Sequence, residues 1–162
     1  MADHTKTFIK KNSDRIPDGE RVIAALIGAS KGSALRHGVQ VGAGGLLGAV
    51  AGAREAKAQE KLREELAQTG DTDAAAWPEG NYFWLVLTDQ HLRVFQGTPG
   101  SSQVGASTYY SIDRIASLDF DKKMVLSKLG VCFKDGTRID LDVGKQKFQP
   151  FLDEFGKHVP VN

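Results

Sequence analysis

The chain of 162 residues has one cysteine, a net charge of only +1 and no long run of strongly apolar residues. The single cysteine, Cys132, excludes an intramolecular disulfide and any cysteine-rich zinc site, and it fits a reducing cytoplasm. Basic and acidic residues are also balanced on each side of residue 80, so neither half has the strong field that attracts nucleic acid. We therefore expect a cytoplasmic protein without a nucleic-acid partner.

The N-terminal segment contains no apolar run, so no secretory signal is predicted. The one candidate for a membrane span is the uncharged stretch 38–53, with the sequence GVQVGAGGLLGAVAGA. As a helix it would rise about 24 Å, which is short of the roughly 30 Å hydrocarbon core of a bilayer. Glycine and alanine also contribute little transfer energy. A spanning helix is therefore disfavoured, whereas association with a membrane surface stays open.

Residue patterns that carry catalysis or metal binding are absent as well. The histidines have no metal-like spacing, and we interpret them as solvent-exposed or incidental. They are His4, His37, His91 and His158. Aspartates alternate along two predicted strands, where they could pair or, more simply, form the solvated outer face of a sheet. They are Asp119, Asp121, Asp140 and Asp142. No histidine or asparagine motif accompanies Cys132. We expect no enzyme, metal or cofactor.

Short strands dominate the second half of the chain. Apolar alternation and β-forming composition predict seven strands in all, the first of them early in the chain. The predicted strands are 21–28, 82–87, 92–95, 107–112, 116–121, 125–133 and 139–143. The stretch 134–137, with the sequence KDGT, predicts a hairpin turn, and a change of apolar phase near Lys128 suggests a bulge or bend.

Helical periodicity replaces the strand pattern at the C-terminus. Apolar residues recur there at the spacing of one helix face, which needs a hydrophobic surface such as the inner face of the sheet. These residues are Phe148, Phe151, Leu152, Phe155 and Val159. A short helix at 5–12 is also predicted, and residues 71–80 are interpreted as a linker.

A long helix is predicted at 33–68, because no proline interrupts it and its later half consists of good helix formers. Glycines at four-residue spacing form a ridge without side chains, as in a glycine zipper, where another backbone can approach closely. The ridge consists of Gly38, Gly42, Gly44, Gly48 and Gly52. Candidate lipid or partner contacts are Lys31, Arg36, Leu46, Leu47 and Val50. A flexible linker, or a helix packed on its own domain, is the alternative.

Four sequence runs followed by the phenylalanine-rich helix resemble, in their order, the bacterial PH-like and GRAM-like families. The runs are GERVIAALI, LVLTDQHLRVF, YYSIDRIASLDF and VCFKDGTRIDLDV. The resemblance implies an α+β fold, a seven-stranded antiparallel barrel or sandwich with a C-terminal amphipathic helix. The chain then divides into residues 1–28, the inserted helix 33–68 between strands 1 and 2, and the remainder of the domain at 80–159. This insertion departs from the family pattern.

The departure bears on function. In PH domains that bind phosphoinositides, the loop after the first strand carries clustered Lys and Arg, whereas here Lys31 and Arg36 stand almost alone. We therefore expect a non-enzymatic binding or assembly module, in which the glycine-repeat helix mediates homo-oligomerisation, contact with a protein partner or contact with a membrane surface. The alternative is a carrier of a small molecule or lipid, with the barrel mouth as pocket and the helix as lid.

Overall fold

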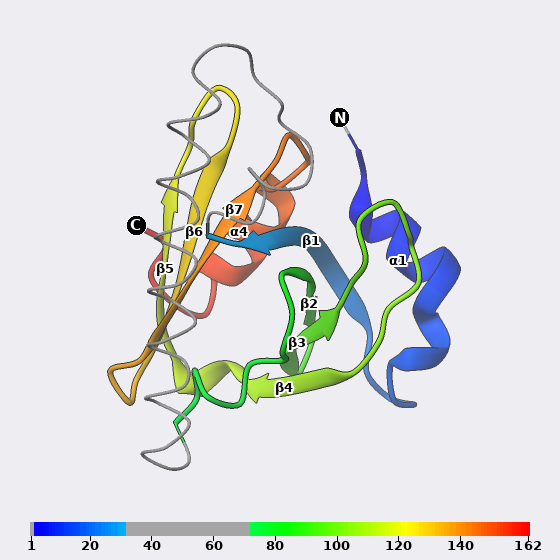
Figure 1. Cartoon of the computed structure of the whole chain (residues 1–162). Coiled ribbons are helices and arrows are strands. Elements are labelled where there is room, and N and C mark those ends of the chain that lie inside the picture. Colours follow the sequence, from blue (N-terminus) through cyan, green and yellow to red (C-terminus); the bar gives the residue numbers. More distant parts are fainter. Residues whose placement is uncertain (1, 32–71) are drawn as a thin grey trace.

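The computed structural model describes residues 2–31 and 72–162. Within these ranges the chain forms one antiparallel sheet and two α-helices, one at each end of the chain (Figure 1). The helices are α1 (His4–Asn12) and α4 (Gln149–Gly156), with short 3-10 turns η1 (Ser13–Arg15) and η2 (Ile112–Arg114). The strands are β1 (Val22–Ser30), β2 (Tyr82–Thr88), β3 (His91–Gln96), β4 (Ser107–Ser111), β5 (Ile115–Asp121), β6 (Ser127–Phe133) and β7 (Arg138–Val143). The predicted seven strands and C-terminal helix are confirmed.

The strand order is β4-β3-β2-β1-β7-β6-β5, with β1 at the junction of two halves. β1 pairs with β2 along its length, but it pairs with β7 only at its last two residues, Ala29 and Ser30. Because the two halves share so short a ladder, their strands need not run in the same direction. Figure 1 shows the two halves crossing each other around a common interior. β4 and β5, at the two edges, are not paired with each other, so the sheet is open.

The main core fills the space between the two halves of the sheet and is closed by α4. The predicted apolar stripe of this helix faces inward: Phe151, Leu152 and Phe155 are all buried. Pro150 lies in the first turn, where its missing N–H costs no helical hydrogen bond. Full burial of each large apolar side chain stabilises the fold by roughly 1.5–3 kcal/mol, so this helix is a principal contributor to the core.

A second, smaller core lies on the opposite face of the sheet under α1, the helix predicted at 5–12. Phe8 is completely buried, with its ring 5.8 Å from that of Trp84 and 5.3 Å from that of Phe95. The Asp3 side chain caps the helix by accepting a hydrogen bond from Lys6 N. The N-terminal segment is therefore an integral part of the domain.

Residues 72–80, interpreted as a linker, pack against the core instead. Ala74 and Trp77 are buried, and the Trp77 ring makes an edge contact with Phe83 at 5.8 Å. Tyr110 Oη donates a hydrogen bond to the carbonyl of Asp73, which anchors the segment to β4. The large apolar indole of Trp77 is buried against the rings of Phe83 on β2 and Tyr110 on β4.

The C-terminal tail protects one edge of the sheet. Leu118 N donates to the carbonyl of Pro160, Asn162 N donates to Leu118, and Phe120 N donates to Asn162. These hydrogen bonds run beside β5 and satisfy backbone groups that an edge strand would otherwise expose.

Two predicted details around β6 are wrong. This strand begins at Ser127, because Met124 and Val125 lie in the preceding turn with their side chains exposed to solvent. The irregularity expected near Lys128 lies instead on the neighbouring strand, where the register of β5 shifts between Ile115 and Ser117. An apolar pair next to a strand cannot be told from the strand itself by periodicity alone.

The predicted helix at 33–68 lies outside the described residues. So does the glycine ridge with most of its candidate contacts: Gly38, Gly42, Gly44, Gly48, Gly52, Arg36, Leu46, Leu47 and Val50. Lys31 is described and follows β1 directly. In the ranges 2–31 and 72–162, the helices are all too short or too polar to cross a bilayer.

Candidate ligand-binding cavity

A cavity of about 340 Å³ opens where the two halves of the sheet separate. Its wall combines the end of β1, the start of β2, the first residue of α1 and three connections, namely β3–β4, β5–β6 and β7–α4. The described lining residues are His4, Ile27, Gly28, Ala29, Asn81, Tyr82, Pro99, Leu126, Asp142, Gly144, Lys145 and Gln146. Its size lies in the lower part of the range of small-ligand sites.

The course of β1 and β7 explains why the cavity exists. Their ladder ends at the pair Ala29 and Asp142, beyond which β7 stops and the chain turns away. Gly28 allows the close approach just before this point, since a Cβ there would lie 3.2 Å from Leu141 Cδ1. The strands are thus tightly joined at one point and open immediately beside it.

Gln146 closes the wall of the cavity by taking the place of a missing strand. Its amide Oε1 accepts a hydrogen bond from Ile27 N at 2.8 Å, and its Nε2 donates to Ile27 O at 2.6 Å. The side chain is buried, and these two bonds imitate the backbone ladder that β7 no longer supplies. Gln146 therefore shapes the cavity, and its amide is already engaged.

The described part of the wall carries four titratable side chains, namely His4, Tyr82, the buried Asp142 and Lys145. Burial lowers the pKa of His4, against a smaller opposing effect of Asp3, so its imidazole is uncharged at pH 7. Burial raises the pKa of Tyr82, which keeps its phenol protonated. Lys145 is exposed at the rim, and the described residues place no carboxylate within ion-pair distance of its ammonium group. The cavity thus combines apolar residues and the uncharged His4 and Tyr82 with the buried Asp142 and, at its edge, the Lys145 cation.

A separate polar cluster forms around the buried carboxylate of Glu20. Arg93 donates to both of its oxygens at 2.7 Å, Thr88 Oγ1 donates at 3.0 Å, and His91 Nδ1 lies 2.7 Å from Oε1. The hydrogen bonds from Arg93 are the largest reason that the pKa of Glu20 falls to about 2. His91, predicted to be exposed or incidental, is an integral member of this cluster.

The Glu20 cluster joins two stretches that the resemblance singled out separately, the GE before the first strand and the TDQHL turn. Both carboxylate oxygens accept a hydrogen bond from Arg93, so Glu20 fastens the start of β1 to the β2–β3 hairpin rather than presenting a free acid. Sequence reasoning missed this pairing. Its one visible signal is Arg93, a charged residue within the apolar run of β3.

The outer face of β5, β6 and β7 carries a second ionic network. Arg138 binds Asp119 through Nη1 and Asp140 through Nε, and Asn162 Nδ2 donates to Asp119 at 3.0 Å. Gly130 makes room for the guanidinium, because a Cβ there would overlap it. This network refines the prediction of solvated aspartates: Asp119 and Asp140 lie on the half-exposed outer face, and Arg138 bridges them with a single positive charge.

The two remaining residues of that prediction differ from each other. Asp142 is buried, whereas Asp121 is exposed and pairs with Lys123 at 2.9 Å. The Cys132 Sγ lies 3.6 Å from an oxygen of Asp119, without a histidine partner in the described structure. Lys31 lines a second concave site, of about 360 Å³, on this face.

The described residues bring no metal-binding cluster together. No group of three histidine, cysteine or acidic side chains within these ranges is placed to hold a metal ion. A scan against protein-family models finds no match for this chain, and a search of the curated proteins finds none either. The argument about function therefore rests on the cavity and its surroundings.

Proposed function

We propose that this chain is a non-enzymatic, PH-like binding module whose ligand occupies the cavity beside β1 and β7. Support for a PH-like assignment comes from the strand order, the single helix closing the core and the meeting of the GE and TDQHL motifs at Glu20. The observation that carries the binding function is the cavity itself, a concave site whose wall combines apolar residues with a limited set of polar side chains.

The chemistry of the wall selects a class of ligand. Leu126, Ile27 and Pro99 favour an apolar body, and the uncharged His4 imidazole offers hydrogen bonding without a charge. The Lys145 ammonium at the rim favours an anionic or strongly accepting end. A small amphiphile with one negatively charged group, such as a fatty acid or an aromatic acid, meets all of these conditions.

A glycine in the wall allows a sharp test. A Cβ on Gly144 would meet no atom of the described structure within 4 Å, and the backbone there has an ordinary φ, so Gly144→Leu fills space without straining the chain. Anilinonaphthalene sulfonate, an apolar fluorophore with one anionic group, is the probe. We expect the wild-type protein to bind it and Gly144→Leu to bind it at least tenfold more weakly.

The matched control is Lys134→Leu, which adds the same side chain at an exposed hairpin position remote from the cavity. Equal dye binding by Gly144→Leu, Lys134→Leu and the wild-type chain would remove the cavity as a binding site. Thermal unfolding of each variant shows whether the fold is retained.

A second candidate function, assembly, rests on the glycine repeat. Gly44, Gly48 and Gly52 recur at every fourth residue, the spacing at which helices associate closely. On this proposal the chain is a homo-oligomer or binds a helical partner, and light scattering gives a mass above that of the monomer. Gly48→Leu should reduce that mass. A monomeric wild-type chain would eliminate self-association.

A further inference from the structure

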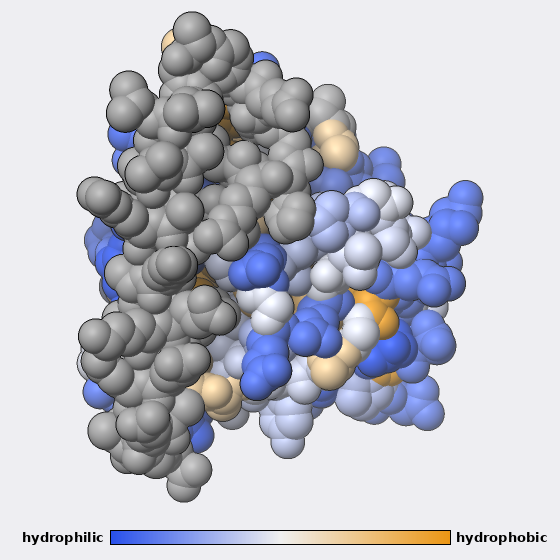
Figure 2. Space-filling model, in the orientation of Figure 1, coloured by the Kyte–Doolittle hydropathy of each residue, from blue (hydrophilic) through white to orange (hydrophobic). Residues whose placement is uncertain are grey.

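The turn between β5 and β6 exposes two apolar side chains. Met124 is 91% exposed and Val125 is 67% exposed, more than any other large hydrophobic residue in the described ranges. In the view of Figure 2, the coloured surface is largely hydrophilic and has only small hydrophobic areas. Lys122 and Lys123 precede the pair directly. Exposure of this apolar tip, formed by Met124 and Val125, to water is unfavourable in free energy, and contact with an apolar environment would relieve it.

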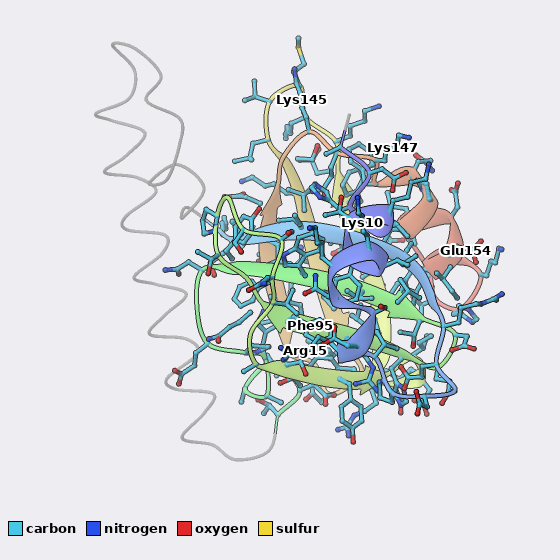
Figure 3. All side chains as sticks on the ribbon, turned by 90° about the vertical axis from the view of Figure 1, so that its right-hand side faces the viewer. Lys10, Arg15, Phe95, Lys145, Lys147 and Glu154 are labelled. Atoms are coloured by element: carbon cyan, nitrogen blue, oxygen red, sulfur yellow. The ribbon has the colours of Figure 1, made fainter. Side chains whose placement is uncertain are left out.

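Further positive charge gathers at the same end of the molecule. Ser127 pairs with Val143, so the residues just before β6 and just after β7 lie next to each other. Lys145 and Lys147 follow β7 and both lie at this end in Figure 3. Lys122 reaches across to the same segment, with its Nζ 5.9 Å from the centre of the Phe148 ring.

The nearby carboxylates neutralise only part of this charge. Asp121 pairs with Lys123 at 2.9 Å, and Asp3 lies 3.7 Å from the ammonium of Lys147. Lys122 and Lys145 have no ion-pair partner among the described residues. The end of the molecule around the apolar tip is therefore net positive.

We propose that this basic-apolar tip contacts the surface of an anionic lipid bilayer. Met124 and Val125 enter the interfacial region, while the ammonium groups of Lys122, Lys123 and Lys145 lie at the level of the lipid phosphates. Opposite charge selects an anionic surface over a neutral one. The apolar part of this surface lies outside the cavity, because neither Met124 nor Val125 lines it, whereas Lys145 also stands at the cavity rim.

The shape of the tip favours a bilayer over a protein partner. Two side chains on a projecting turn offer far less than the roughly 800 Å² per partner of a stable protein interface. A bilayer needs no complementary shape, since lipids move aside to admit an apolar side chain. Membrane contact by this tip is therefore weak, reversible and dependent on the anionic lipid.

Flotation of the full chain with vesicles tests the proposal. We expect binding to phosphatidylcholine vesicles that contain phosphatidylserine, little binding to phosphatidylcholine alone, and loss of binding as salt is raised. Each lysine near an anionic surface strengthens binding about fivefold, so K122Q/K123Q should weaken it about 25-fold. M124S/V125S keeps the charge and should weaken binding several-fold. K10Q/K134Q removes two exposed lysines elsewhere and should have a much smaller effect.

Several outcomes would overturn the proposal. Absence of vesicle binding at low salt would do so, as would binding that M124S/V125S and K122Q/K123Q leave unchanged, which would assign contact to another segment. An equal loss for K10Q/K134Q would show attraction without a defined site. Self-association without lipid that M124S/V125S abolishes would identify a second copy as the occupant. Dye binding by the cavity should survive both tip variants, which separates this test from that of the proposed function.

Discussion

Removal of the charge on Glu20 should lower the stability of the whole domain. Its side chain is only 5% exposed, and it holds β1 to the β2–β3 hairpin through Arg93, His91 and Thr88. Glu20→Gln retains the shape and one acceptor oxygen but leaves the Arg93 guanidinium without its counter-charge. Because a broken buried pair leaves an uncompensated charge, the cost is large for a single substitution.

The pKa of Glu20 sets the magnitude. The difference between the ordinary value of 4.5 and about 2 in the folded protein corresponds to about 3 kcal/mol of stability. Since the folded-state pKa is depressed, this contribution is fully present above pH 4.5 and is lost as pH falls toward 2. The wild-type protein should therefore lose about 3 kcal/mol more than Glu20→Gln over that range.

Urea unfolding at pH 7 and at several values down to pH 2 measures both effects. At pH 7 the variant should be less stable by about 3 kcal/mol, and the two curves should converge in acid. Asp18→Asn, which changes an exposed acid in the same turn, is the control and should change stability by less than about 0.5 kcal/mol. Parallel curves for wild type and Glu20→Gln would refute the assignment of this acid-sensitive stability to Glu20.

Two further substitutions probe the second core under α1 and the wall of the cavity. Phe8→Ala removes the centre of the second core and should cost about 3–5 kcal/mol in urea unfolding, whereas the half-exposed Ile9→Ala should cost far less. Gln146→Leu leaves the N–H and the carbonyl of Ile27 without their partners and should cost about 2 kcal/mol. Gln146→Leu should also alter dye binding. Dye binding equal to that of the wild-type protein would show that Gln146 does not shape the cavity wall.

Local patterns predicted those elements whose structure is decided locally. The hairpin at 134–137 follows from its sequence, with Gly136 at φ 90°, where glycine is favoured. The period of Phe151, Leu152 and Phe155 likewise identified the closing helix and its buried face. These features need no knowledge of distant residues, because alternation and helical spacing are written along the chain itself.

Features that join distant parts of the chain escaped prediction for the opposite reason. Glu20 and Arg93 are 73 positions apart, and Gln146 and Ile27 are 119 apart, so no local window contains either pair. Trp77 was assigned to a linker because Pro78 and Gly80 suggest irregular structure. Irregular backbone can still bury a large side chain, and here it does.

The distribution of satisfied polar groups indicates where this molecule can bind. Glu20 is surrounded by protein donors, so little of its carboxylate is left to offer a ligand, and Arg138 is committed to two aspartates. Lys145 differs, since the described residues give it no partner, and it stands beside Gly144 and open space. Hydrogen bonds and charges already committed within a fold contribute stability, whereas uncommitted ones beside a cavity contribute affinity. The end of the sheet where β7 stops is therefore the part of the described structure best suited to recognition.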